Sequence, residues 1–500
     1  MALRHGLLLS LGGMFAVAQA FGQAPVPKQT TPPPQTFNKR VVMALPAKGG
    51  GPAEPRLPHT LAEALAATYA TQPALQAERA KLRATDENVP QALAGWRPTV
   101  IVAGQLGYGD GLLRQVTGTG VSEKVITERD IGTAQATLTQ PIYTGGKVQA
   151  SVNRAKNQVM AERANLIAQE QTSFTNVVNA YVGVIQAQQL LALNVNNEQV
   201  LAKQLQATND RFRVGEITRT DVAQAEAALA GATAQRQTSE GNLQTARGTY
   251  QQVVGYLPPG DLVEPQPLAL PVKTEQDAMA TAGNNNPQVV AALFNDAAAK
   301  DAVDVAFAQL LPQVSFQGQM FQQTNGSASG PSATNGYTAI LNLSVPIYQG
   351  GSEYSAVRQA RQTAQQTTRL IADARRTAVQ NAVQAWETLA AAKASAASTR
   401  EQIRANQIAL EGVEREAIVG SRTTLDVLNA QQALLNSQVT LVQNLAQLVL
   451  ASYQVAAAIG RLTARDLHLP VPLYDDTAYY NAVKNRWAGL GDYATNQPGR

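Results

Sequence analysis

A six-residue phrase occurs twice in this chain, as PIYTGG at 141–146 and as PIYQGG at 346–351. Gly215 follows the first phrase at the same interval at which Gly420 follows the second. Upstream of the phrase the two copies also match, but with a slightly larger offset, so the first copy has nine extra residues. The chain is therefore an internal duplication, and its fold must be built from two similar halves.

The duplication divides the chain into segments. Repeat 1 is predicted over 58–260 and repeat 2 over 286–465, with an inter-repeat linker at 261–285 and a C-terminal tail at 466–500. The composition favours one extended architecture over separate compact domains. Five hundred residues exceed the usual size of a single core, and only 5% of them are aromatic, which suits long helices packed through small side chains.

The N-terminal region has the features of an export signal. Residues 1–20 combine a basic start, an apolar stretch and a small-x-small site at Ala18-Gln19-Ala20, which predicts a signal peptide. The proline-rich segment 21–57 is expected to be a linker. The absence of cysteine excludes disulfides and a cysteine-linked lipid anchor. The net charge of +4 is not gathered into a basic run, so nucleic acid is not an expected partner.

Each repeat contains two stretches in which apolar and polar residues alternate, as they do in half-buried strands. The predicted strands are 97–109 and 132–142 in repeat 1, and 312–323 and 337–347 in repeat 2. About ten residues is the length with which a tilted strand spans a bilayer. The nine extra residues of repeat 1 fall between its strands and are expected to form an exposed polar loop.

Long proline-free stretches follow both phrases. They predict helices over 146–212 and 351–418, each about 100 Å long at 1.5 Å per residue. Both helices break at a Val-Gly pair, and return helices are expected over 219–255 and 423–460. A shorter helix, 73–96 in repeat 1, precedes each strand pair. Each repeat thus contains a helical hairpin, and two short helices end to end match the length of the long one.

The repeated phrase itself is expected to join a strand to a long helix. Pro141 and Pro346 cannot donate to a central ladder and should end the strands. The glycines that follow allow the backbone to turn into the helix, and they are Gly145, Gly146, Gly350 and Gly351. Four strands cannot close a barrel in hydrocarbon, so membrane insertion would require an oligomer.

The strand-to-helix phrases LTQPIYTGG and LSVPIYQGG and the turn phrases RVGEITRTDVAQAEAAL and IVGSRTTLDVLNAQQALL resemble the TolC-like outer-membrane channel family. The resemblance covers about 58–465. It implies a mainly α fold with β structure: a homotrimeric channel-tunnel with a 12-stranded barrel, four strands per protomer, and a long coiled-coil tube. It also implies the outer membrane of a Gram-negative bacterium, contact with outer-membrane lipid, and an equatorial position for the inter-repeat linker.

The same resemblance implies the exit duct of a tripartite export system. Its partners would be a periplasmic adaptor and an inner-membrane transporter, either an ABC transporter or a proton-driven pump. The tail LPVPLYDDTAYYNAVKNRWAGLGD and the phrase TRTDVAQAEAAL look most like the type I protein secretion branch. Multidrug efflux is the alternative within the family. A periplasmic coiled-coil structural protein without a pore is the alternative from another class.

By resemblance, Asp426 is assigned to a carboxylate ring at the periplasmic pore entrance. Asn429 stands where some members have a second acidic ring, and Arg422 with Asp221 stands where a charge pair holds the closed state. Asp221 and Asp426 also stand where an acid favours a helix N-terminus, which would be a purely structural role. The residues expected to dock the adaptor are those of the two hairpin turns: Val214, Gly215, Val419 and Gly420.

The sequence offers no catalytic, cofactor-binding or metal site. Gly145-Gly146-Lys147 resembles a phosphate loop, but Pro141 stands where that motif needs glycine, and Val148 where it needs Ser or Thr. Beyond the predicted signal peptide only two histidines remain, and no nucleophile with a nearby base is evident. An enzymatic activity is therefore not expected.

Overall fold

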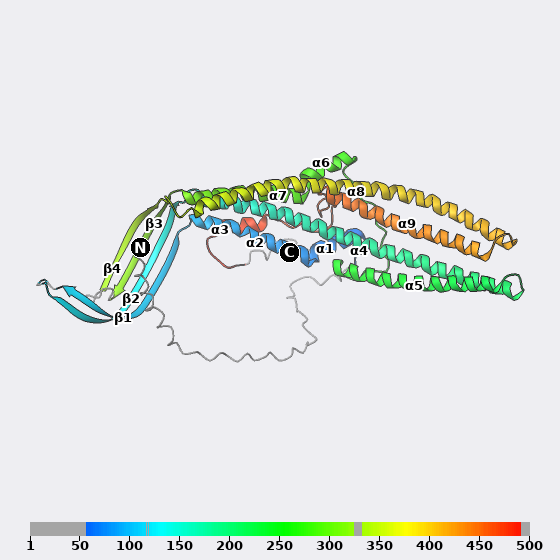
Figure 1. Ribbon diagram of the computed structural model, residues 1–500, viewed down its shortest axis with the longest axis horizontal. Helices are drawn as coiled ribbons and strands as arrows, with labels where there is room; N and C mark the ends of the chain where they lie inside the picture. Colours follow the sequence, from blue (N-terminus) through cyan, green and yellow to red (C-terminus); the bar gives the residue numbers. More distant parts are fainter. Residues whose placement is uncertain (1–56, 117, 119, 325–332, 492–500) are drawn as a thin grey trace, which may run out of the picture. The chain divides into compact units, whose positions relative to one another are not determined.

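The computed structural model describes residues 57–116, 118, 120–324 and 333–491. The predicted signal peptide, all of the proline-rich segment up to residue 56, and residues 492–500 of the tail lie outside the described part. Figure 1 shows long helices side by side, with a four-stranded sheet next to one of their ends.

Two helical hairpins form the main body of the described chain. In repeat 1, α4 (Lys147–Arg213) packs against α5 (Arg219–Val254), and in repeat 2, α8 (Ser352–Ile418) packs against α9 (Thr424–Ala458). Five of the seven buried side chains of α8 are alanines, which allows its neighbours to approach closely. Within the described residues, no helix is both long enough and apolar enough to cross a membrane.

Shorter helices lie along the long ones. Helices α2 and α7 contact α4, and α7 also contacts α8. The short elements are α1 (Leu61–Thr71), α2 (Pro73–Asp86), α3 (Asn88–Leu93), η1 (Ala94–Trp96), α6 (Glu275–Asn285), α7 (Pro287–Phe307) and η2 (Ala308–Leu310).

Two predictions about these short helices were wrong. The predicted 73–96 helix is divided at Glu87, because Pro90 has no N–H to donate to the Asp86 carbonyl. Repeat 2 has Asp304 at the equivalent position, and α7 runs without a break. The predicted linker 261–285 is also partly helical, since it contains α6, which has in repeat 2 the place that α1 has in repeat 1.

The four strands form one antiparallel sheet in the order β1-β2-β3-β4. They are β1 (Thr99–Val116), β2 (Ser122–Tyr143), β3 (Gln313–Thr324) and β4 (Ala333–Ser344). The extra residues of repeat 1 are not the polar loop that we predicted. β1 and β2 stay paired from Asp110 and Glu128 as far as Val116 and Ser122, because this segment keeps β-favouring residues such as Ile126 in alternation.

The register of the sheet places most of its large exposed apolar side chains on one face and a row of amides on the other, where Ile101 and Ile340 are also exposed. One face carries large apolar side chains that are more than half exposed, and these are Val100, Val102, Leu106, Met320, Tyr337, Leu341 and Leu343. The other face carries amides, with Gln319 donating to Gln135 over 2.9 Å and Asn342 donating to Gln317 over 3.1 Å. An exposed apolar face opposite an amide-lined face is unusual for a sheet in water on both sides.

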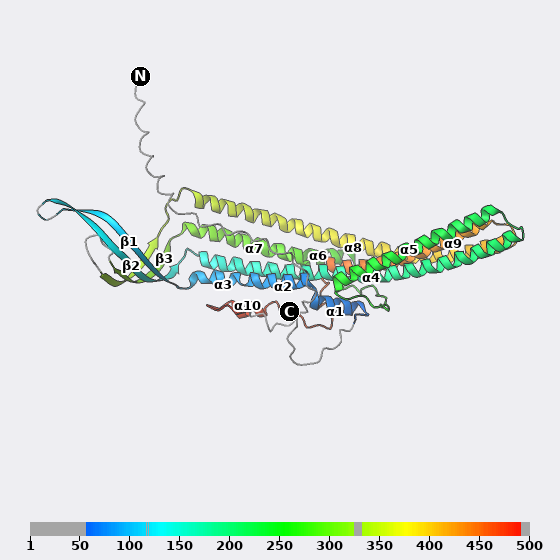
Figure 2. The same ribbon diagram turned by 90° about the horizontal axis from the view of Figure 1, so that it is seen from below.

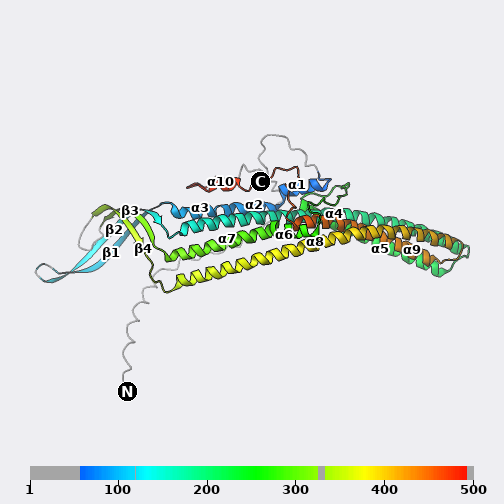
Figure 3. The same ribbon diagram turned by 90° about the horizontal axis from the view of Figure 1, so that it is seen from above.

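The C-terminal tail packs against the short helices of repeat 1. Its helix α10 (Ala478–Val483) packs against α2, and Figures 2 and 3 show it running beside α2 in both views. Tyr474 N–H donates to the Tyr69 hydroxyl at 3.1 Å, and the Tyr479 hydroxyl donates to Glu87 at 2.8 Å. The tail is therefore part of the folded body as far as α10.

Candidate functional site

The turn of the first hairpin is a helix C-cap built on glycine. Gly215 has φ +81°, its N–H donates to Phe212 O at 3.0 Å, and Glu216 N–H donates to Arg211 O at 3.0 Å. This pair of bonds is a Schellman motif, which satisfies carbonyls that the helix end leaves free. Val214, the C-cap residue, is 72% exposed.

The second turn repeats the first. Gly420 has φ +79°, its N–H donates to Ala417 O at 3.3 Å, and Ser421 N–H donates to Glu416 O at 3.0 Å. Val419 is 78% exposed, and Ile418 beside it is also exposed. Both tips therefore present apolar side chains on a backbone that only glycine adopts without strain.

Both return helices begin with a capping box. Thr218 and Asp221 exchange hydrogen bonds at the start of α5, and Thr423 and Asp426 do the same at the start of α9. The N–H and hydroxyl of Thr423 each donate to Asp426 Oδ2 at 2.9 Å, and these bonds lower the pKa of Asp426. In this chain both predicted site acids, Asp221 and Asp426, are the third helical residue of a capping box.

Both bonds from Thr423 go to Oδ2 of Asp426, so Oδ1 takes no part in the capping box. Asp426 is half-buried. Asn429 follows one turn later on the same face of α9 and is exposed. The structure thus brings the two predicted gate residues side by side at the hairpin tip.

The predicted latch pair is not formed within the chain. Arg422 Nε donates to Glu416 Oε2 at 2.9 Å, across the Gly420 turn, whereas the Asp221 carboxylate accepts from Thr218. Sequence reasoning missed Glu416. By the 205-residue offset Glu416 is the copy of Arg211, which pairs with Glu216 across the first turn at 3.2 Å. The copy of Glu216 is Ser421, so the duplication alone does not predict the partner of Arg422. Each tip therefore has an ion pair across its glycine turn, with the charges reversed.

The two tips are also joined to one another. Arg211 Nη2 donates to the carbonyl of Ala417 at 3.4 Å, from the first hairpin to the second. This long bond is a polar contact between the two turns. It places an arginine of repeat 1 against the helix end that precedes Gly420.

The joints between strands and long helices contain paired glycines. Gly146 and Gly351 are the N-caps of α4 and α8, with φ of +82° and +85°. A Cβ on Gly145 would lie 2.8 Å from Ala308 O, so the chain needs glycine there for close approach as well as for its conformation. Gly350 also has positive φ but has open space around it.

The prolines of the joints behave differently from our prediction. Pro141 does not end β2, which continues to Tyr143 with a register shift on the β3 side. No β1 residue stands opposite Pro141, because β1 begins at Thr99, opposite Thr139. The register shift at Pro141 is an irregularity of the kind at which sheets accommodate proline. Pro346 lies beyond β4, whose last residue is Ser344 rather than 347.

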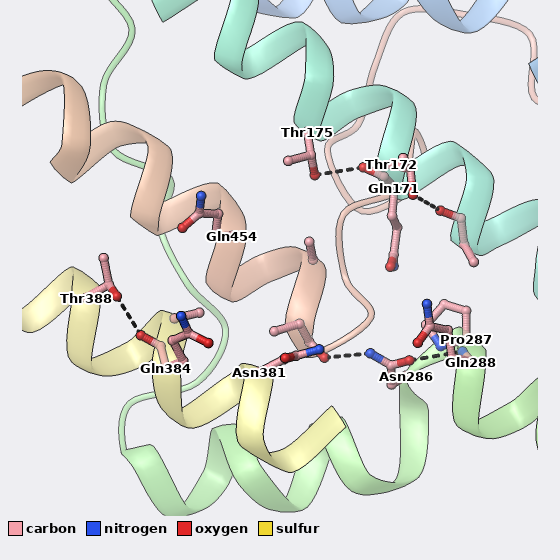
Figure 4. A pocket seen from close by; sticks show the side chains of 14 residues that line it. Gln171, Thr172, Thr175, Asn286, Pro287, Gln288, Asn381, Gln384, Thr388 and Gln454 are labelled. Atoms are coloured by element: carbon pink, nitrogen blue, oxygen red, sulfur yellow. Dashed lines mark hydrogen bonds between the residues drawn. The ribbon is translucent and has the colours of Figure 1, made fainter. Parts of the chain in front are cut away.

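A polar cavity of about 390 Å³ lies where α9 ends and α7 begins, between α4 and α8 (Figure 4). Asn286 links these two helix ends: its amide donates to Ala458 O at 3.1 Å and its oxygen accepts from Gln288 N–H at 2.9 Å. The lining is made of amides, hydroxyls, alanines and Pro287, without a charged group. It contains no general base or nucleophile. Within the described residues no cluster of His, Cys, Asp or Glu could hold a metal ion.

Comparison with known proteins gives the family. The sequence profile of the family "Outer membrane efflux protein" matches residues 65–256 and 279–461, one match for each repeat. The outer membrane efflux protein BepC of Brucella suis is 36% identical over 87% of this chain and 92% of its own length. The outer membrane protein TolC of Escherichia coli is 26% identical over 67% of this chain and 70% of its own length.

The fold agrees with solved structures. The outer membrane protein VceC of Vibrio cholerae superposes with a TM-score of 0.68, covering 80% of this chain and 96% of that one at 20% identity. All three of these proteins are named as outer membrane proteins. With two matched repeats and a relative at 36% identity, this chain belongs to the outer membrane efflux protein family.

Proposed function

We propose that this protein is the passive exit duct of a tripartite export system, working as a homotrimer. The observation that carries the proposal is the sheet, with an exposed apolar face, an amide-lined face, and β1 and β4 as open edges. An apolar face suits lipid, a polar face suits an aqueous lumen, and open edges need neighbours in hydrocarbon. Three copies would close a barrel of twelve strands with the hairpins as a tube beneath it.

The hairpin tips would form the periplasmic entrance. Asp426 and Asn429, repeated three times around the axis, would line the pore, and Arg422 with Glu416 would hold the turn in its closed arrangement. The exposed side chains of Val214 and Val419 would contact the periplasmic adaptor. Neutralising Arg422 is expected to raise the single-channel conductance of the purified protein in planar bilayers, and unchanged conductance would refute the latch.

Type I protein secretion with an ABC transporter is the cargo route that we propose first. It rests on the likeness of the tail and of TRTDVAQAEAAL to that branch. Multidrug efflux with a proton-driven pump is the second candidate, because the relative at 36% identity is named an efflux protein. Deleting the gene and measuring both secreted proteins and drug susceptibility separates them: protein secretion fails in the first case, and drug sensitivity rises in the second.

The assembly is tested by fractionation and mass. A trimer that fractionates with outer membranes and migrates differently after heating is expected. A protein released with the soluble periplasmic contents would instead support the coiled-coil structural alternative.

A further inference from the structure

The end of the described tail lies beside the start of the sheet. The Arg97 side chain donates to the carbonyl oxygen of Arg486, and its guanidinium carbon lies 5.0 Å from the centre of the Trp487 ring. Arg97 stands just before Thr99, the first residue of β1. A single arginine therefore holds the tail at the level where the sheet begins.

Despite this attachment, the apolar side chains at this end of the tail are open. Trp487 is 71% exposed and Leu490 is fully exposed. A tryptophan held on one side by a cation–π contact and bare on the other is positioned for a second partner.

The surroundings of Trp487 match a membrane–water interface. Two of the chain's three tryptophans, Trp96 and Trp487, lie at this level, and Gln140 at the end of β2 donates to Trp96 O at 2.9 Å. Tyr143, the last residue of β2, is half exposed, and Tyr348, which follows β4, is largely exposed. Tryptophan and tyrosine concentrate where strands leave the hydrocarbon.

The charge of the segment fits lipid head groups. Residues 484–491 read KNRWAGLG, with two basic residues, and the acidic Asp492 follows them in the sequence. Arg97 is the cation that lies against the indole ring, whereas Lys484 lies 5.5 Å from the centre of the Tyr480 ring and donates to Asn481. Phosphate-bearing head groups are anionic, and an indole prefers the boundary between head groups and acyl chains.

We infer that the tail around Trp487 is a second membrane contact, bound in the head-group layer on the periplasmic side of the outer membrane and clamped there by Arg97. The inference rests on the proposed function, since it needs the sheet to lie in that membrane. It assigns a lipid-binding role to a segment outside both repeats. The competing occupant of the exposed indole is a neighbouring copy of the chain.

Single-tryptophan proteins test this directly. Trp96→Phe with Trp386→Phe leaves Trp487, and Trp96→Phe with Trp487→Phe leaves Trp386, which lies in α8 about 50 Å from the joint at 1.5 Å per residue. Each is reconstituted into phospholipid vesicles whose acyl chains are brominated either near the head group or near the methyl end. We expect Trp487 to lose most of its emission with the shallow bromines and less with the deep ones, and Trp386 to keep its emission with both.

Failure of the tail's lipid contact and failure of the proposed membrane-inserted sheet give different results. If the protein floats with the vesicles and Trp487 keeps its emission, the tail faces water or another protomer, and the lipid contact is refuted while the channel stands. If the protein does not float with vesicles, the membrane-inserted sheet fails and the inference falls with it.

A second measurement avoids the tryptophan changes. Because the chain has no cysteine, Ala488→Cys carries a single spin label on the tail, and Ser395→Cys carries one on the exposed surface of α8. Oxygen concentrates in lipid and a water-soluble nickel chelate in water. The ratio of relaxation by oxygen to relaxation by the chelate should therefore be higher for the label at 488 than for the label at 395. Identical behaviour at the two positions would overturn the inference.

Discussion

The side-chain amide of Asn194 donates to the hydroxyl of Ser239 over 2.8 Å, inside the first hairpin where both residues are buried. The second hairpin has the same bond with its partners exchanged, since Asn444 donates to the hydroxyl of Thr399 over 3.0 Å. Both positions are related by the same offset that separates the two PIYxGG phrases. A buried polar pair between antiparallel helices fixes their alignment, because any slip leaves both groups without a partner.

Replacing Asn194 by Ala is therefore expected to destabilise the first hairpin by about 1–3 kcal/mol, because the Ser239 hydroxyl is left buried and unpaired. Hydrogen exchange of α4 and α5 measures the loss. The matched control is Asn194→Thr with Ser239→Asn, which installs the arrangement of the second hairpin and should restore protection. Equal exchange in the single and double variants would contradict the pairing.

Two glycines of the second hairpin should respond in opposite directions. Gly420→Ala puts a Cβ on a residue with φ +79° and should lower the free energy of unfolding by about 1–2 kcal/mol. Gly412 lies in the interior of α8, where a Cβ would meet nothing within 4 Å. Gly412→Ala should therefore raise the free energy of unfolding by about 0.5–1 kcal/mol. Hydrogen exchange near the tip measures both. A neutral Gly420→Ala would show that the turn is not needed.

Because Arg422 pairs with Glu416 rather than Asp221, Glu416→Gln should loosen the second turn as Arg422 neutralisation does. Both side chains are about half exposed, so the expected rise in conductance is less than about tenfold and shrinks at about 1 M salt. Glu411→Gln is the control, since Glu411 faces Arg415 at 3.9 Å on an open helix surface. An effect at Glu411 as large as at Glu416 would assign the change to general surface charge.

Asp86 makes the stability depend on pH. It is 1% exposed beneath the tail, neither carboxylate oxygen has a hydrogen-bond partner among the described residues, and burial raises its pKa from 3.8 to about 7. Arg163 opposes this rise, while Asp476 and Glu87 add to it. The folded state thus holds a proton that the unfolded state releases, so stability falls as the pH rises from about 4 to about 7 and is level above.

Asp86→Asn removes this titration. The variant should unfold at the same temperature as the parent near about pH 4 and at a temperature a few degrees higher near about pH 8, where the parent has an ionised buried carboxylate. Circular dichroism melting at the two pH values measures the difference. A variant that is less stable than the parent at high pH would show that Asp86 is paired when ionised.

The duplicated sequence by itself determined the hairpins. Gly215 and Gly420 interrupt stretches without proline, and capping residues follow them, so each turn is decided by short-range backbone conformation and local hydrogen bonds. The alternation in β3 and β4 likewise determined which face is apolar. Asp426 and Asn429 share a helix face because of their spacing alone.

Only the tertiary structure decided the partners across the chain. Arg422 pairs with Glu416 rather than with Asp221 because the Gly420 turn brings the Arg422 and Glu416 side chains together. Strands β1 and β2 are longer than predicted because their additional residues pair with one another. The burial of Asp86 and the contact of Arg97 with Trp487 depend on a tail that returns from the other end of the sequence. The burial of Asp86 and the Arg97–Trp487 contact have no local pattern in the sequence, because their energy comes from surfaces that meet only after the chain has folded.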